Sequence, residues 1–127
     1  MKNKLENRKA YSINDELKER TCTDNYYKMF ADIVCTDGVK ELVELGQCYW
    51  MLSEVAFKTI ELQKKQKEYE YDFLVFTLKR VKGSRFKISI SDGNKVFESK
   101  DIPFSDFEYD EATIWVENNV MLLPSEH

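Results

Sequence analysis

The feature that most constrains the fold is a change in the spacing of hydrophobic residues near Glu70. Before this point apolar residues recur every three or four positions, as in segment 39–45, and this spacing is typical of helices. After it, apolar and polar residues alternate, as in segment 86–91, and this spacing is typical of strands buried on one face. The pattern therefore predicts helices in the first half of the chain and strands in the second, which is an α+β fold.

The first half contains three helix starts and one longer apolar helix. Ser12, followed by acidic residues, is an N-cap for a short helix that runs to about Arg20. The sequences CTDN at 22–25 and CTDG at 35–38 repeat each other, and we interpret both as helix starts with Thr-Asp capping chemistry. In the second, Asp37 is expected to accept from the free amides of the following turn. The segment 48–65 is apolar around most of its circumference and is expected to be the most buried helix.

The second half predicts strands joined by short turns. The expected strands are Tyr71–Val81, Phe86–Ser91, Lys95–Ser99, Ala112–Glu117 and Val120–Leu123. Pro103 cannot donate to a β-ladder and should end the third strand region. We therefore expect N-terminal helices packed on one face of a four- to five-stranded antiparallel β-meander. The predicted core comprises Trp50, Leu52, Val55, Phe73, Val75, Ile88 and Ile114.

Length and composition bound the class of protein. The 127 residues fit a single α+β domain spanning 1–127, and the charged segment 1–10 is expected to be a flexible tail. No segment is apolar for long enough to cross a membrane, and the N-terminus lacks the apolar region of a signal peptide, which predicts a cytoplasmic protein. Three cysteines are too few for a disulfide framework.

Candidate catalytic and metal-binding groups are sparse in this sequence. The single histidine, His127, is the last residue, and phosphate-binding glycine loops and CxxC pairs are absent, so we expect no metal and no cofactor. The acidic segment 106–111 can hold a cation or act in acid–base chemistry. However, Phe107 and Tyr109 interleave its carboxylates, and we favour a solvated edge with inward aromatic residues.

Charge is distributed unevenly along the chain, which has a net charge of −4. Segment 58–87 holds nine Lys or Arg against four acidic residues, whereas segment 92–127 holds two Lys against nine acidic residues. Such polarity can steer a charged partner. Alternatively, the two segments lie side by side in the sheet and partly neutralise each other.

Several stretches together resemble a known family. These are CTDGVKELVELGQCYWMLSEVA from Cys35, DFLVFTLKR from Asp72, SDGNKVFESKDIPFSDFEYDEATIWVEN from Ser91, and VMLLPSE from Val120. They are similar to a family of small bacterial and phage-borne proteins known only as a domain of unknown function. The segments TDGVKEL and VENNVMLLPSE are the more specific parts. The resemblance implies a phage or mobile-element context, and no family active site accompanies it.

Three classes of function remain, and two of them involve a binding surface. The first is a non-enzymatic protein-binding module, such as an inhibitor or adaptor, with Trp115 as an exposed anchor. Trp115 should point away from the helices because Ile114 and Val116 point toward them. Alternatively, the C-terminal tail or the Pro103 loop folds over Trp115 and buries it within the monomer. The second is nucleic-acid binding through the basic hairpin, which the net negative charge disfavours. A carboxylate-based enzyme is the least favoured class, and a homo-oligomer is compatible with all three. The basic hairpin candidates are Lys79, Arg80, Lys82, Arg85 and Lys87.

Overall fold

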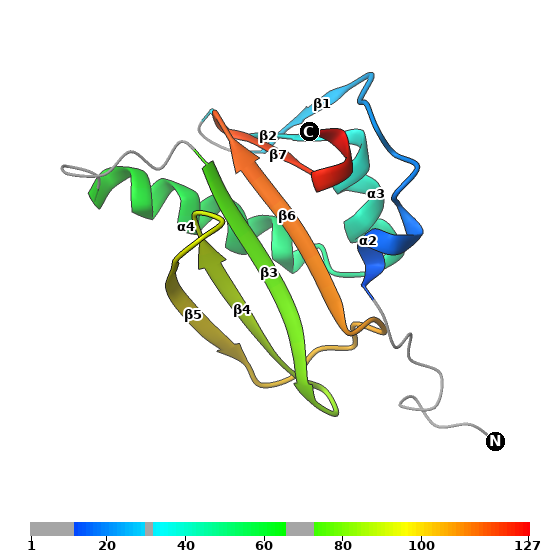
Figure 1. Cartoon of the computed structure of the whole chain (residues 1–127), viewed down its shortest axis with the longest axis vertical. Helices are drawn as coiled ribbons and strands as arrows, with labels where there is room; N and C mark the ends of the chain where they lie inside the picture. The colour runs from blue at the N-terminus through cyan, green and yellow to red at the C-terminus, as the bar shows by residue number, and fades with distance from the viewer. Residues whose placement is uncertain (1–11, 30–31, 66–72) are drawn as a thin grey trace.

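One mixed sheet organises the fold, and its seven strands follow the order β1-β2-β7-β6-β3-β4-β5. A computed structural model describes residues 12–29, 32–65 and 73–127, and Figure 1 shows the sheet with α4 behind it. Neighbouring strands are antiparallel except β2 and β7, which are parallel. The strands are β1 (Tyr26–Lys28), β2 (Val34–Thr36), β3 (Phe73–Lys82), β4 (Arg85–Ser91), β5 (Val96–Ile102), β6 (Glu111–Glu117) and β7 (Val120–Leu122).

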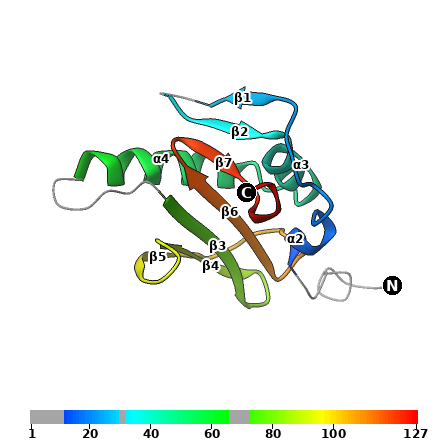
Figure 2. The ribbon, with the colours of Figure 1, turned by 45° about the horizontal axis from the view of Figure 1, so that its top comes forward.

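The α+β class is confirmed, but the expected four- to five-stranded meander is wrong in size and order. All five expected strands are present, although residues 71 and 72 lie outside the described part. The central strand β3 pairs with β6 on one side and β4 on the other. The additional strands, β1 and β2, come from the half of the chain that was expected to be helical. Figure 2 shows them beside β7, at the opposite end of the sheet from β5.

Three helices and one short turn complete the described fold, and they are α2 (Ile13–Glu16), α3 (Asp37–Leu45), α4 (Trp50–Lys65) and η1 (Pro124–Glu126). Ser12 caps α2, since its hydroxyl accepts from the Asn14 amide at 3.1 Å. This helix ends at Glu16 rather than near Arg20. Thr36 caps α3 in the same way through the Val39 amide at 3.2 Å. The Ser12 cap and the start of α3 were predicted from sequence, because capping is a local property. The acceptor expected for α3 was Asp37, but its carboxylate accepts from the amides of Asp24 and Asn25 instead.

The helices cover one face of the sheet, and the core lies between them. Alternate residues of the two central strands point to this face and are buried: Leu74, Phe76 and Leu78 of β3, and Ala112, Ile114 and Val116 of β6. Val55, Ile88 and Ile114 are buried as predicted. The other predicted core residues are only half-buried: Trp50, Leu52, Phe73 and Val75. Phe73 and Val75 point to the opposite face of the sheet.

Two chain reversals show how local sequence sets the strand connections. Asn118 and Asn119 both have positive φ, 51° and 65°, which is the backbone required by a two-residue hairpin between β6 and β7. Strand β5 ends at Ile102 rather than at the expected Ser99, immediately before Pro103, which cannot donate to the ladder. The expected tail 1–10 lies outside the described residues. Within the described residues, every helix is too short or too polar to span a membrane.

Candidate functional site

The sheet face opposite α4, here called the open face, carries three bands of side chains. An apolar band contains Phe73, Val75 and Trp115, because Val75 and Trp115 are directly opposed and Phe73 precedes Val75 by two residues. A hydroxyl band follows, in which Thr77 is paired with Thr113 on one side and Ser89 on the other. Among the described elements, η1 lies in front of this face near β7 (Figure 1).

The third band is cationic and brings together four of the five predicted basic residues. Lys79 is opposite Lys87, and Lys82 is opposite Arg85, across the β3–β4 hairpin. Opposed residues of an antiparallel pair point to the same face, so all four cations lie on the open face. Each of the four is exposed. Like charges directly opposite each other are destabilising, and therefore this band carries an unfavourable interaction that a bound anion would relieve.

Acidic residues flank the cationic band on both sides. Glu111 of β6 is opposite Lys79, and Asp101 of β5 is opposite Lys87. Across β6, β3, β4 and β5 the charges therefore follow the order acid, base, base, acid. The basic and acidic halves of the chain do lie side by side here, as one of the two sequence interpretations expected. Lys82 and Arg85, further along the hairpin, have no acidic residue opposite them in the described ladder.

Arg80 is set apart from the other predicted basic residues because it points to the helix-covered face. Its side chain is 9% exposed, and its Nε lies 3.0 Å from Asp110 Oδ1. The guanidinium also donates to the carbonyl oxygens of Gly83, Phe107 and Tyr109, and it stacks on the Phe86 ring at 4.5 Å. Arg80 therefore fixes the loop before β6, and its donors are used within the fold.

The apolar band is partly covered by the end of the chain. The Trp115 ring contacts Phe73 at 5.1 Å and His127 at 5.3 Å between ring centroids, both in edge-on geometry. His127 Nε2 also lies 2.9 Å from a Glu117 carboxylate oxygen. Trp115 faces away from α4 as predicted and remains half-buried under His127. His127 thus covers part of the Trp115 ring, in line with the alternative that the end of the chain folds over it, and a role of Trp115 as a partner anchor stays a prediction.

The repeated Thr-Asp segments are bonded to one another and have a structural role. The Asp37 amide donates to Thr23 Oγ1 at 2.8 Å, and the Asp37 carboxylate accepts from the amides of Asp24 and Asn25 and from the Tyr27 hydroxyl at 2.8 Å. These donors lower the pKa of Asp37 below its ordinary value, with the Asp24 amide as the largest cause. The expected helix at Thr23 is wrong, because Asp37 holds this segment in an extended path toward β1.

The neighbouring residues of the second repeat hold the C-terminal turn. Glu126 accepts from Thr36 Oγ1 at 2.6 Å, from the Gly38 amide at 3.2 Å and from the Leu123 amide at 2.9 Å. A Cβ atom at Gly38 would lie 2.6 Å from the Glu126 carboxylate, so only glycine leaves room for this contact. The TDG sequence therefore ties three distant segments together, and its prominence in the sequence has a structural explanation.

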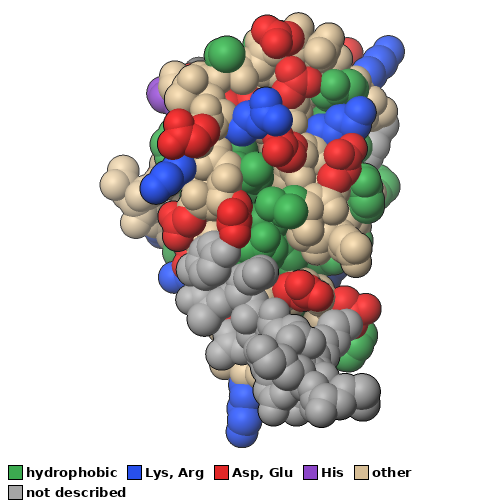
Figure 3. Space-filling view, turned by 90° about the vertical axis from the view of Figure 1, so that its right-hand side faces the viewer, with side chains coloured by type: hydrophobic (Ala, Val, Ile, Leu, Met, Phe, Trp, Pro, Cys, Tyr) green, Lys and Arg blue, Asp and Glu red, His purple; other side chains and the backbone are tan. Residues whose placement is uncertain are grey.

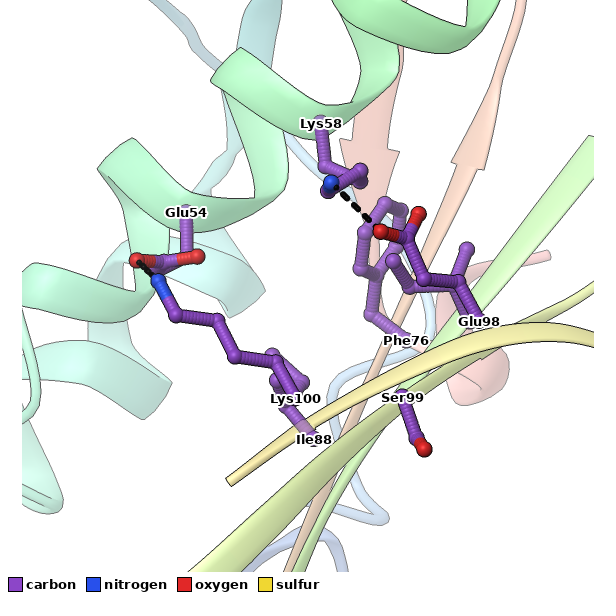
Figure 4. Close-up of a pocket in the computed structure, with 8 residues that line it drawn as sticks. Glu54, Lys58, Phe76, Ile88, Glu98, Ser99 and Lys100 are labelled. Carbon is purple, nitrogen blue, oxygen red and sulfur yellow. Dashed lines mark hydrogen bonds and ion pairs between the residues drawn. The ribbon is translucent and has the colours of Figure 1, made fainter. Parts of the chain in front are cut away.

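A cleft between α4 and the edge strand β5 is the second candidate site (Figure 4). Its volume is about 140 Å³, and its floor is formed by the buried side chains of Phe76, Ile88 and Ile90. Two ion pairs join the helix to the strand at its rim. Lys100 Nζ lies 2.7 Å from Glu54, and Lys58 Nζ lies 3.0 Å from Glu98. This cleft could not be predicted from the sequence, because its two walls are about 40 residues apart in the chain.

The remaining sequence candidates for chemistry have structural explanations. Phe107 and Tyr109 are buried while Asp106 and Glu108 are exposed, which confirms the solvated edge with inward aromatic residues. Clusters of three or more metal-ligating side chains do not occur within residues 12–29, 32–65 and 73–127. Burial raises the pKa of the Cys35 thiol to about 11 and that of the Cys48 thiol to about 12. Both thiols are therefore protonated and unreactive at neutral pH.

Comparison with known proteins places the chain in a family without assigning an activity. Residues 11–127 match the family of unknown function DUF6876, and the chain belongs to this family. No curated protein and no solved structure matches it. The resemblance to a domain of unknown function that was noted in the sequence is thereby confirmed.

Proposed function

We propose that this chain is a non-enzymatic protein-binding module, of the inhibitor or adaptor type, whose partner binds the open face. The observation that carries the proposal is the placement of an apolar band and a cationic band on one sheet face. Aromatic side chains and arginine are the residue types most enriched at the energetically important positions of interfaces. Both types are present on this face, in Trp115 and Arg85.

The spacing of the bands specifies the chemistry of the partner. Val75 and Lys79 are four residues apart on β3, which corresponds to about 13 Å along a strand. The partner is therefore a protein surface with an apolar anchor and, about 13 Å from it, a group of carboxylates. Carboxylates at that position would separate the opposed Lys79 and Lys87 charges and complement Lys82 and Arg85.

Other surfaces of the molecule are less suited than the open face to binding such a partner. The side of the molecule that carries α2 and α3 mixes acidic and basic side chains around a hydrophobic centre (Figure 3). Such a mixture gives little electrostatic preference for a partner of one sign. Nucleic acid is disfavoured because acids flank the cationic band at Glu111 and Asp101 and because the net charge is −4.

The test compares capture of lysate proteins by three forms of the immobilised chain. The forms are the wild type, Lys79→Gln/Lys87→Gln on the open face, and Lys18→Gln/Lys64→Gln as a control pair of exposed lysines outside the sheet. We expect one acidic protein to be captured by the wild type and the control and lost with the open-face variant. Its capture should weaken as salt rises from about 0.05 to 0.5 M, because exposed charges are screened.

Three outcomes would overturn the proposal. The first is capture that survives the open-face substitutions, and the second is capture that nuclease treatment of the lysate abolishes, since the latter indicates nucleic acid. The third is a wild type that is dimeric by light scattering and becomes monomeric on Trp115→Ala with its circular dichroism unchanged. That result would make the open face a contact between copies of this chain.

A further inference from the structure

The α4–β5 cleft has the size and the lining of a small-molecule site, separate from the open face. Its volume of about 140 Å³ is close to that of a dry engineered cavity of about 150 Å³ that binds benzene. Phe76, Ile88 and Ile90 form an apolar floor and are at most 3% exposed. The floor therefore suits an apolar group about as large as a phenyl ring or a branched four-carbon chain.

The rim positions charges of both signs on both walls. Glu54 and Lys58 are one turn apart on α4, and Glu98 and Lys100 are two residues apart on β5, so both spacings are about 6 Å. Glu54 binds Lys100 and Lys58 binds Glu98, so each wall presents one cation and one anion, and the two pairs lie side by side along the rim (Figure 4).

These ion pairs are weak enough to open. Lys100 and Glu54 are 54% and 31% exposed, and a pair with that exposure contributes about 0–1 kcal/mol. Lys58 is 19% exposed and Glu98 is 42% exposed, and Lys58 keeps a second ion pair with Glu61 at 2.9 Å when its pair with Glu98 opens. Lys58 stays cationic throughout the neutral range. Glu61 and then Glu98 raise the pKa of Lys58 above its ordinary value of 10.5. A ligand that enters the α4–β5 cleft therefore meets two cations and two anions at its rim.

We propose that the cleft binds a zwitterion with an apolar side group, which is the chemistry of a hydrophobic α-amino acid. A ligand with a single charge takes one member of an opened ion pair and leaves the other member, which has the same sign as the ligand, without that partner. A ligand with both charges bridges the two members of one opened pair, with its ammonium on the glutamate and its carboxylate on the lysine. All four rim charges then keep a partner while the side group rests on the apolar floor.

The first test measures binding of L-phenylalanine and of two analogues that each lack one charge. The analogues are 3-phenylpropionate, which lacks the ammonium, and phenethylamine, which lacks the carboxylate. Amide chemical shifts of α4 and β5 are followed up to about 10 mM ligand, which saturates a site with a Kd of about 1 mM. We expect L-phenylalanine to bind at least tenfold more tightly than either analogue.

The second test changes the order of preference through single rim substitutions. Lys100→Gln leaves Glu54 without its partner, so phenethylamine should become the preferred ligand of that variant. Glu54→Gln leaves Lys100 without its partner and should favour 3-phenylpropionate. Lys95→Gln, an exposed residue in the β4–β5 turn, is the matched control and should retain the wild-type order.

The proposal is overturned if L-phenylalanine shifts no α4 or β5 resonance at about 10 mM, a concentration that detects a Kd of about 1 mM. It is also overturned if the three ligands bind equally or if both rim variants keep the wild-type order, because either result shows that the rim charges do not select the ligand.

Discussion

Replacement of Arg80 by Met tests whether this residue belongs to the fold rather than to a partner surface. The guanidinium makes one ion pair with Asp110 at 3.0 Å and donates to three backbone carbonyls, two of which belong to the buried residues Phe107 and Tyr109. Methionine keeps an unbranched apolar stem, although it is shorter than arginine. It removes every donor.

The expected loss follows from these contacts. Each buried carbonyl left without a donor costs about 1 kcal/mol or more, and stacking of the guanidinium on Phe86 contributes about 0.5–1 kcal/mol. Asp110 is 33% exposed, so water replaces part of its ion pair and reduces the penalty for leaving it alone. We therefore expect Arg80→Met to lower the free energy of unfolding by about 2–4 kcal/mol.

Urea denaturation followed by circular dichroism measures this loss, with Arg85→Met as the control. Arg85 is exposed on the open face, and its replacement should change stability by about 0.5 kcal/mol or less. A loss below about 1 kcal/mol for Arg80→Met, with an unchanged dependence on urea, would contradict the structural role. Arg80 would then be available to a partner.

Three further predictions concern the Thr-Asp contacts and the cysteines. Gly38→Ala should lower the free energy of unfolding by about 1–2 kcal/mol in the wild type, because its Cβ would displace the Glu126 carboxylate. The loss should be much smaller in a Glu126→Ala background, and a double-mutant cycle by urea denaturation measures the difference. The folded-state pKa of Asp37 lies below 3.8, so its contribution to stability is present above that pH and is lost as the pH falls further. Asp37→Asn should therefore flatten the decline in the urea midpoint on acidification below about pH 4, and an unchanged decline would contradict the role of its hydrogen bonds. Cys22 is exposed and should react with a thiol reagent in the native protein at about pH 8, whereas the two buried cysteines should react only in denaturant; three equally fast thiols would refute this burial.

Local features of the sequence were sufficient for the parts of the fold that depend on neighbouring residues. The cap at Ser12 needs only a hydroxyl and a nearby amide, and it was predicted, as was the start of α3 at the second Thr-Asp sequence. Alternation in segment 86–91 was enough to define β4, whereas β5 continues to Ile102, beyond the predicted end at Ser99. The opposite facing of Trp115 and Ile114 followed from the two-residue period of a strand.

Tertiary structure decided what the sequence left ambiguous. The CTDN segment has the residues of a helix start, yet the Asp37 carboxylate bonds its amides and holds it extended, and this contact spans 12–13 residues of chain. The basic candidates could not be divided from sequence, because the β-bulge between Arg80 and Lys82 determines which of them share a face. The α4–β5 cleft depends on ion pairs between residues 40 and 46 positions apart, Lys58 with Glu98 and Glu54 with Lys100. Capping and alternation are set by covalent neighbours and are visible in the sequence, whereas long-range pairing depends on how separate elements pack, and only the folded chain brings those residues together.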